Sequence, residues 1–218
     1  MKYSVIIPVY NEEENVYALY ERLTGVMEKL SPDFELVFIN DGSRDKTFPL
    51  VKALSVNDNR VKYINLSRNF GHQIAVSAGL DACQGERVVI IDADLQDPPE
   101  LIAEMDQKMN DGFQVVYARR RKRQGESVSK LLTARLFYRL LANIASIDIP
   151  LDTGDFRIMD RKVVNVLKAM PEQNKFLRGQ ISWIGFRQTF VEYDRSERHG
   201  GKTGYTYAKM FRFALDGI

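Results

Sequence analysis

The sequence contains few of the residues that build disulfide frameworks and zinc sites. Among its 218 residues there is one cysteine, Cys83, and there are two histidines, His72 and His199. A single cysteine excludes an internal disulfide and a CxxC metal site. The two histidines lie too far apart in the sequence to form a zinc signature. A chain of this length buries about 70% of its unfolded surface on folding, so its core needs no such cross-links.

Long hydrophobic runs are also absent. No apolar run approaches the roughly 18 residues that a membrane-spanning helix requires. The first residues, MKYSVIIPVYNEEEN, contain a short apolar run that reaches a proline, and no small-residue cleavage site follows it. This pattern is unlike a signal peptide. We therefore expect a cytoplasmic chain in which no segment spans a bilayer.

The charges nearly balance but are unevenly placed. The 31 basic and 29 acidic residues give a net charge of +2. Residues 119–139 contain eight Lys or Arg and one acid, whereas residues 92–106 contain six acids and no base. A basic block and an acidic block in one fold indicate two different charged ligands, such as a phosphate and a metal ion. The basic run at 119–123 lacks interleaved aromatic residues, which argues against a nucleic-acid partner.

Strand and helix patterns alternate over the first 120 residues. The predicted strands are 3–9, 35–40, 61–65, 87–92 and 114–118, and the predicted helices are 11–30, 45–56, 71–84 and 98–110. This alternation predicts a doubly wound, mostly parallel sheet, which binds ligands at the carboxyl ends of its strands. The patterns that follow predict helices at 127–147, 157–169, 174–184 and 205–218, a strand at 188–193 and a glycine-rich loop at 196–204.

The strongest chemical motif is Asp92-Ala-Asp94-Leu-Gln-Asp97, which closes a buried strand. Two carboxylates at i and i+2 can reach one hard divalent cation once the chain bends, and Gln96 offers an amide oxygen to the same cation. The alternative is a turn or a helix cap ahead of Pro98, since Asp favours both.

Asp41 ends the second predicted strand in the segment FINDGS. An acid at this position suits ribose hydroxyls or a base edge, and the alternative is a simple Asn-Asp-Gly turn. The chain has neither GxGxxG nor GxxxxGK[ST], so dinucleotide-binding and P-loop interpretations are weak.

Five segments together resemble glycosyltransferase family 2, whose members have the GT-A fold. They are IIPVYNEEEN, FINDGS, LSRNFGHQIAVSAGLDAC, IDADLQDPPE and DTGDFRIMDR. The last two are most similar to the polyprenyl-phosphate branch, which includes dolichyl-phosphate mannose synthase and bactoprenol glucosyltransferase. The resemblance implies an α/β, Rossmann-like fold with a mostly parallel central sheet flanked by helices and with C-terminal amphipathic helices.

The resemblance also implies one GT-A catalytic domain over residues 1–218. Residues up to about 120 would bind the nucleotide sugar, and the rest would bind the acceptor and the membrane interface. Members of this branch usually carry C-terminal transmembrane helices, which this chain lacks. We therefore expect either the catalytic part of a longer protein or a peripheral relative.

Site residues follow from the resemblance, position by position. The residues implied to hold the nucleotide are Pro8, Tyr10, Glu12, Asp41 and Asp92. Those implied to hold Mg²⁺ or Mn²⁺ on the donor diphosphate are Asp92, Asp94 and Gln96. Those implied to bind the acceptor phosphate are Arg119, Arg135 and, in the loop RHGGKTGY, Lys202. Asp155 stands where the family places its proposed base, and together with Asp94 it forms the implied catalytic pair.

The implied reaction is an inverting transfer from a UDP-sugar, or alternatively GDP-mannose, to a polyprenyl phosphate at the cytoplasmic membrane surface. The second pKa of a phosphomonoester is near ~6, so such an acceptor needs positioning more than deprotonation. Asp155 would then orient a group or steady positive charge. Two alternatives stay open: transfer to a sugar hydroxyl with Asp155 as a true base, and a non-catalytic nucleotide-sugar-binding module. A homo-oligomer is compatible with the resemblance.

Overall fold

A single mixed sheet forms the centre of the protein. The computed structural model describes residues 1–121, 153–172 and 176–194. Within them the sheet has the strand order β3-β2-β1-β4-β6-β5-β7. The strands are β1 (Tyr3–Val9), β2 (Phe34–Asn40), β3 (Val61–Asn65), β4 (Arg87–Ile90), β5 (Val115–Arg120), β6 (Thr153–Asp160) and β7 (Gln188–Tyr193). Of the seven strands in the described residues, only β6 runs antiparallel to both of its neighbours, β4 and β5. The predicted mostly parallel sheet is confirmed.

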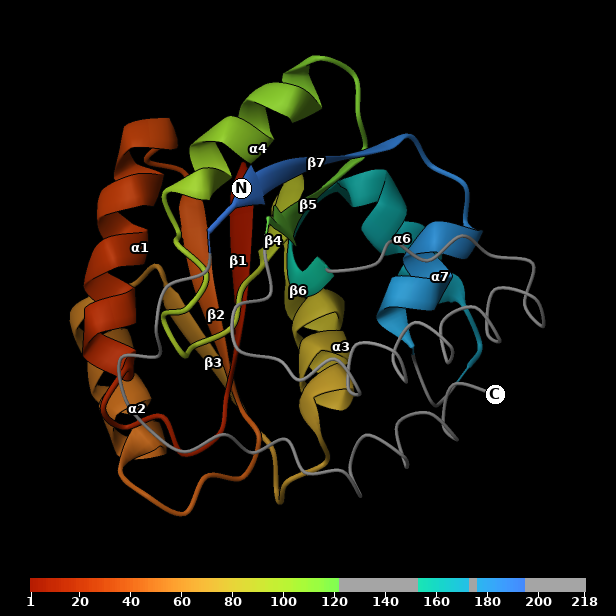
Figure 1. Cartoon of the computed structure of the whole chain (residues 1–218). Coiled ribbons are helices and arrows are strands. Elements are labelled where there is room, and N and C mark those ends of the chain that lie inside the picture. The colour runs from red at the N-terminus through yellow and green to blue at the C-terminus, as the bar shows by residue number, and fades with distance from the viewer. Residues whose placement is uncertain (122–152, 173–175, 195–218) are drawn as a thin grey trace.

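Helices cover both faces of the sheet (Figure 1). On one face lie α1 (Val16–Leu30), α2 (Thr47–Asn57) and α4 (Leu101–Asn110). On the other lie α3 (His72–Ala82), α6 (Arg161–Ala169) and α7 (Leu177–Trp183). Because parallel strands end at the same edge, this arrangement places the loops after β1, β2 and β4 together at one edge of the sheet.

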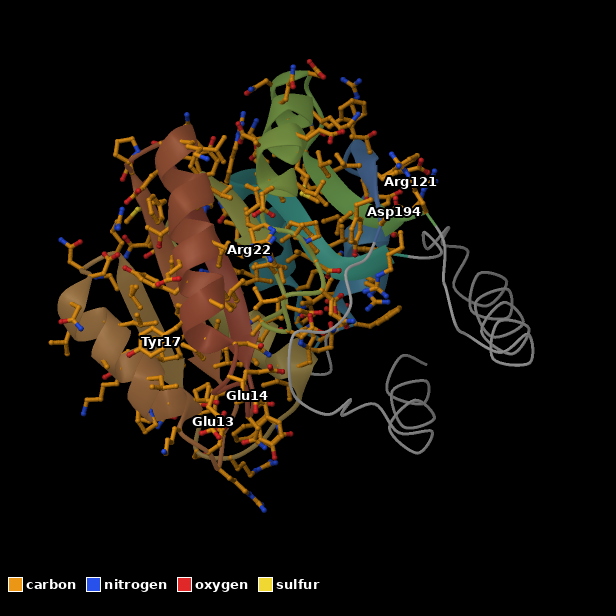
Figure 2. The ribbon with its side chains drawn as sticks, turned by 60° about the vertical axis from the view of Figure 1, so that its left-hand side comes forward. Glu13, Glu14, Tyr17, Arg22, Arg121 and Asp194 are labelled. Carbon is orange, nitrogen blue, oxygen red and sulfur yellow. The ribbon has the colours of Figure 1, made fainter. Side chains whose placement is uncertain are left out.

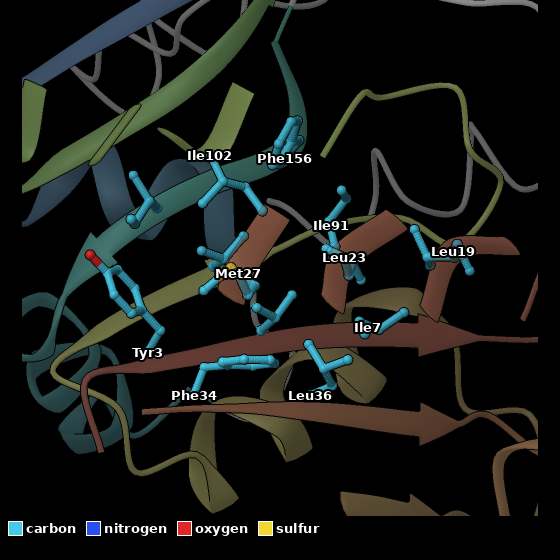
Figure 3. Close-up of a cluster of buried hydrophobic side chains, with 14 of the residues drawn as sticks. Tyr3, Ile7, Leu19, Leu23, Met27, Phe34, Leu36, Ile91, Ile102 and Phe156 are labelled. Carbon is cyan, nitrogen blue, oxygen red and sulfur yellow. The ribbon is translucent and has the colours of Figure 1, made fainter. Parts of the chain in front are cut away.

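The larger of two hydrophobic clusters lies between the sheet and α1 (Figure 3). Leu19, Leu23 and Met27 recur at helical spacing along α1 and are fully buried. They pack on alternate residues of β1, such as Tyr3 and Ile7, because successive strand side chains point to opposite faces. Burying a side chain of this size stabilises the fold by roughly 1.5–3 kcal/mol, so this cluster anchors the loops that extend from β1.

Two predicted boundaries were wrong in ways that affect the site. Residues 157–160 were expected to begin a helix, but they continue β6, and α6 begins at Arg161. Asp155 and Arg157 alternate with Phe156 and Ile158, which is a strand pattern, and it continues β6 in the interior of the sheet as far as Asp160. Asp160 then caps α6 by accepting a hydrogen bond from Lys162 N at 2.8 Å. The helix expected from residue 11 begins only at Val16.

Several predicted features lie outside the described residues. They are the helices 127–147 and 205–218, the loop 196–204, and with them Arg135 and Lys202. In the part of the chain that is described, no helix has the length and hydrophobicity needed to cross a membrane.

Candidate functional site

The loops after β1 and β2 are tied to each other at the carboxyl edge of the sheet. Asn11 N donates to Ser43 Oγ at 3.0 Å, and Arg44 N donates to Asn11 Oδ1 at 2.8 Å. Glu12 N donates to Thr47 Oγ1 at 2.8 Å. Asn11 has a positive φ of 54°, a conformation that asparagine tolerates better than most residues. These bonds, rather than a longer α1, hold the segment between β1 and the helix.

The residues implied to hold the nucleotide sit on this framework. Pro8 is buried in β1, and Tyr10 immediately follows the strand with its side chain exposed. Figure 2 shows Glu13 and Glu14 just before the N-terminus of α1, near Tyr17. The structure thus places Pro8, Tyr10 and Glu12 at or beside the carboxyl end of β1.

Asp41 organises the loop between β3 and α3. Its carboxylate accepts hydrogen bonds from Phe70 N at 2.7 Å and Gly71 N at 3.0 Å. The next residue, Gly42, has a positive φ of 67°, and a Cβ atom there would lie 2.4 Å from the carbonyl carbon of Arg68. Asp41 therefore has a definite structural role beside the nucleotide contact predicted for it.

The loop after β4 that contains Asp92, Asp94 and Asp97, here called the acidic loop (residues 92–97), is largely buried. Asp94 is 7% exposed, and its Oδ1 accepts a hydrogen bond from Gln96 N at 3.2 Å. Leu95, between them, has a positive φ of 59°, which is uncommon for a bulky residue and marks a constrained turn. Arg22 on α1 braces the start of α4 through a 2.7 Å ion pair with Glu100. The chain therefore turns directly after Asp94.

Asp155 in β6 is surrounded by positive groups. Arg178 Nε donates to its Oδ1 at 2.9 Å, and His72 Nε2 lies 2.9 Å from its Oδ2. Arg157 Nη2 lies 3.4 Å from Oδ1, and Gln73 Nε2 donates to Oδ2 at 3.4 Å. The side chains come from α3, α7 and β6, so they meet only in the folded chain.

The same histidine links Asp155 to the acidic loop, because His72 Nε2 also lies 3.7 Å from Asp92 Oδ1. No pattern in the sequence indicates this role for His72 or for Arg178, because their contacts with Asp155 join segments far apart in the chain. The contact brings the predicted metal loop and the predicted catalytic carboxylate into one site.

The surroundings of Asp92 and Asp155 shift the pKa values of these two carboxyl groups in opposite directions. Burial raises the pKa of Asp92 to about 6, assisted by the nearby carboxylates of Asp155, Asp97 and Asp94 and opposed by His72. Burial also acts on Asp155, but Arg178, His72 and Arg157 outweigh it and hold its pKa well below the usual range. For His72, burial opposes protonation, yet Asp92 and Asp155 raise its pKa to about 9.

A second polar cluster anchors the acidic loop from the opposite face of the sheet. Tyr193 in β7 donates a hydrogen bond from its hydroxyl to Asp97, which is 1% exposed. Arg120 Nη2 lies 3.9 Å from the same carboxylate, and Arg120 Nε donates to the Tyr193 hydroxyl at 3.2 Å. The loop is thus fixed to the β5–β7 side of the sheet.

Arg119, implied to bind the acceptor phosphate, is engaged by protein groups. Its Nε donates to Glu192 Oε1 at 3.2 Å, and its guanidinium lies 3.5 Å from the ring centre of Phe190. In β5 it pairs with Thr153, two residues before Asp155. Beyond it Arg121 lies 3.6 Å from Asp194, at the ends of β5 and β7 (Figure 2). A phosphate contact from Arg119 would require it to leave or share Glu192.

The donor set of the acidic loop fits a hard divalent cation. Among the described residues, no group of three or more His, Cys, Asp and Glu side chains is arranged to hold a metal ion. Asp92 and Asp94 nevertheless stand two residues apart in this loop, and Asp94 is one of the carboxylates that, after burial, raise the pKa of Asp92. A cation of the Mg²⁺ type uses one or two carboxylates and completes its shell with water and substrate phosphates. The loop matches that requirement.

Comparison with known proteins identifies the family. Residues 4–167 match glycosyl transferase family 2. The chain is 53% identical to the uncharacterized glycosyltransferase YkcC of Bacillus subtilis (strain 168), over all of this chain and 68% of the relative. It is 42% identical to the prophage bactoprenol glucosyl transferase homolog of Escherichia coli (strain K12), over all of this chain and 71% of the relative.

A solved structure has the same fold. Glucosyl-3-phosphoglycerate synthase from Mycobacterium tuberculosis, crystallised with Mn²⁺, UDP and phosphoglyceric acid, aligns with a TM-score of 0.64. The alignment covers 98% of this chain and 75% of the other, at 17% sequence identity. With the sheet order, the acidic loop and the sequence matches in agreement, the chain belongs to glycosyltransferase family 2.

Proposed function

We propose that this protein transfers a sugar from a nucleoside diphosphate donor to a polyprenyl phosphate. The observation that carries the proposal is the contact of one histidine, His72, with both Asp92 and Asp155, which joins the acidic loop and the buried carboxylate in one site. The acceptor is inferred from relatives named bactoprenol glucosyl transferase, which are 41–42% identical over the whole of this chain.

The donor end of the site would lie over β1, β2 and β4. Pro8, Tyr10, Glu12 and Asp41 are proposed to contact the nucleotide, with UDP favoured because the structural neighbour was crystallised with it. Mg²⁺ or Mn²⁺ would be held by Asp92, Asp94 and Gln96. When bound there, the cation would neutralise the charge that develops on the departing diphosphate.

The electrostatics of Asp155 favour a phosphate acceptor over a hydroxyl. The cations around this carboxylate hold its pKa well below the usual range, which makes it a weak base. A hydroxyl needs a base for its proton, whereas a polyprenyl phosphate already carries negative oxygens near neutral pH. Asp155 would therefore orient neighbouring cationic groups, or steady positive charge on the sugar, while the phosphate attacks the anomeric carbon and inverts it.

The acceptor end is proposed to face a membrane. Arg119, together with Arg135 and Lys202 from outside the described residues, would bind the lipid phosphate. Since the acceptor is a membrane lipid, we propose that the protein works as a peripheral or anchored protein on the cytoplasmic face of the membrane.

Transfer of radiolabel into an organic phase tests this proposal. The protein would be incubated with Mn²⁺, undecaprenyl phosphate in detergent, and a panel of labelled UDP-sugars and GDP-mannose. We expect organic-phase label with at least one donor, and its loss when EDTA removes the metal. No transfer from any donor, from a protein shown to bind UDP, would refute the proposed function. If Asp155→Asn abolishes transfer while Arg135→Ala is nearly silent, a hydroxyl acceptor is favoured instead.

A further inference from the structure

His72 occupies an unusual position between two carboxylates that the proposed reaction uses differently. Its Nε2 lies 2.9 Å from Asp155 Oδ2 and 3.7 Å from Asp92 Oδ1. Its side chain is 37% exposed, so it faces the site rather than the hydrophobic core. A single imidazole nitrogen therefore lies within reach of both acids.

The position of His72 is fixed from the backbone side. His72 is the first residue of α3, and the two residues before it, Phe70 and Gly71, donate their backbone N–H groups to Asp41. Gly71 has a positive φ of 102°, so the chain turns sharply into the helix at this point. The Asp41 carboxylate thus holds the backbone from which the His72 side chain extends.

The position is also fixed from the side of α7. Gln73, the next residue, donates from Nε2 to Asp155 Oδ2 at 3.4 Å and accepts a hydrogen bond from Leu177 N at 3.3 Å. Arg178, beside Leu177, holds the other oxygen of Asp155 at 2.9 Å. The start of α3, the start of α7 and the middle of β6 therefore form one connected unit around Asp155.

The two carboxylates must stay apart if only one of them is to hold a metal. A divalent cation such as Mn²⁺ accepts several carboxylate oxygens, and a second carboxylate within reach would join its coordination shell. We propose that His72 is a positioning residue that fills the space between Asp92 and Asp155 and keeps Asp155 out of the coordination shell of the metal. This inference rests on the proposed function, in which Asp155 acts on the reacting groups and not on the cation.

Two substitutions of matched chemistry test the reach of the side chain. In His72→Gln the amide nitrogen is four bonds from Cα, as is the imidazole Nε2, so it can occupy the space between the carboxylates. In His72→Asn the amide is one bond shorter and leaves that space open. Both variants are neutral amides, so a difference between them reports position and not charge.

We expect the two variants to differ in turnover and in metal binding. The kcat for sugar transfer should be about tenfold lower in His72→Asn than in His72→Gln, the usual scale for residues that orient a metal site, with the KM for donor little changed. Mn²⁺ alone, titrated while the EPR signal of the free ion is followed, should bind His72→Asn several-fold more tightly than His72→Gln. Melting temperatures of the pair should agree within ~3 °C, which separates the effect from a loss of folding.

Equal kcat in the two variants, or equal Mn²⁺ affinity, would overturn this role for His72. Failure of the proposed function gives a different result. In that case the wild-type protein transfers no sugar to undecaprenyl phosphate, and the comparison of Mn²⁺ affinities alone decides whether His72 separates the carboxylates.

Discussion

Replacing Asp155 with asparagine should destabilise the protein. The Asp155 side chain is 12% exposed, and the side chains of His72, Arg178 and Arg157 all lie within 3.4 Å of its carboxylate. An asparagine of nearly the same shape would leave these positive groups close together without their shared anion. Removing one partner of a buried ion pair costs ~3–5 kcal/mol.

We expect the lower end of that range, ~3 kcal/mol, because the guanidinium of Arg178 can reach solvent. For a chain of this size, each 1 kcal/mol lowers the melting temperature by about 2–4 °C, so Asp155→Asn should melt about 6–12 °C below the wild type at pH 7. Circular dichroism on heating measures the difference. Asp160→Asn in the same strand is the matched control, since asparagine caps a helix as well as aspartate does, and it should change the melting temperature little.

The lowered pKa of Asp155 determines how the difference in stability between the wild type and Asp155→Asn changes with pH. The pKa of Asp155 is lowered in the folded state, so its stabilising contribution is complete above the unfolded pKa of ~3.9 and is lost as the pH falls below it. The gap between wild type and Asp155→Asn should therefore be full at pH 7 and should begin to close only below about pH 4. A variant that melts within ~2 °C of the wild type at pH 7 would refute the proposed cluster of charges.

Four further substitutions, one of them a control, test other parts of the structure by thermal or urea unfolding. Gly42→Ala should destabilise the protein by more than ~1 kcal/mol, because the φ of Gly42 is positive and a Cβ there would lie 2.4 Å from backbone atoms. Gly25→Ala, on the open side of α1, should instead stabilise the protein by ~0.5–1 kcal/mol. Equal effects of the two substitutions would contradict this expectation. Asp58→Asn should cost about 2 kcal/mol at pH 7, since hydrogen bonds from Arg60 lower its pKa to about 2; this cost should disappear as the pH falls from about 4 toward 2, and a constant cost would argue against the pairing. Tyr193→Phe should cost ~1.5–3 kcal/mol by removing a buried hydrogen bond to Asp97, and an unchanged urea midpoint would count against that contact.

The acidic loop is the part of the site that the sequence predicted best. Asp92 and Asp94 stand two residues apart after β4, and the β-branched run that marks this buried strand is visible in neighbouring residues of the sequence. Asp155 was implied by resemblance alone. The predicted helix begins at residue 157, whereas the alternation of Asp155 and Arg157 with Phe156 and Ile158 belongs to β6.

The partners of Asp155 could not be read from the sequence. His72 and Arg178 are separated from Asp155 by 83 and 23 positions, and they meet it only because α3 and α7 pack on the same face of the sheet. No periodicity encodes such a contact. For Arg119 the residue type suggested a phosphate contact, but the sequence could not show which protein groups surround it. In β5 it lies beside Glu192 and Phe190 of the neighbouring strand.

The location of bound Mn²⁺ tests most directly whether the acidic loop and Asp155 form one transfer site. Crystals of the protein grown with Mn²⁺ and UDP would be measured for anomalous scattering from manganese. We expect a peak bonded to the Asp92 or Asp94 carboxylate and to the diphosphate, with Asp155 nearby but outside the coordination shell. A manganese peak away from both residues, or one coordinated by Asp155, would contradict it.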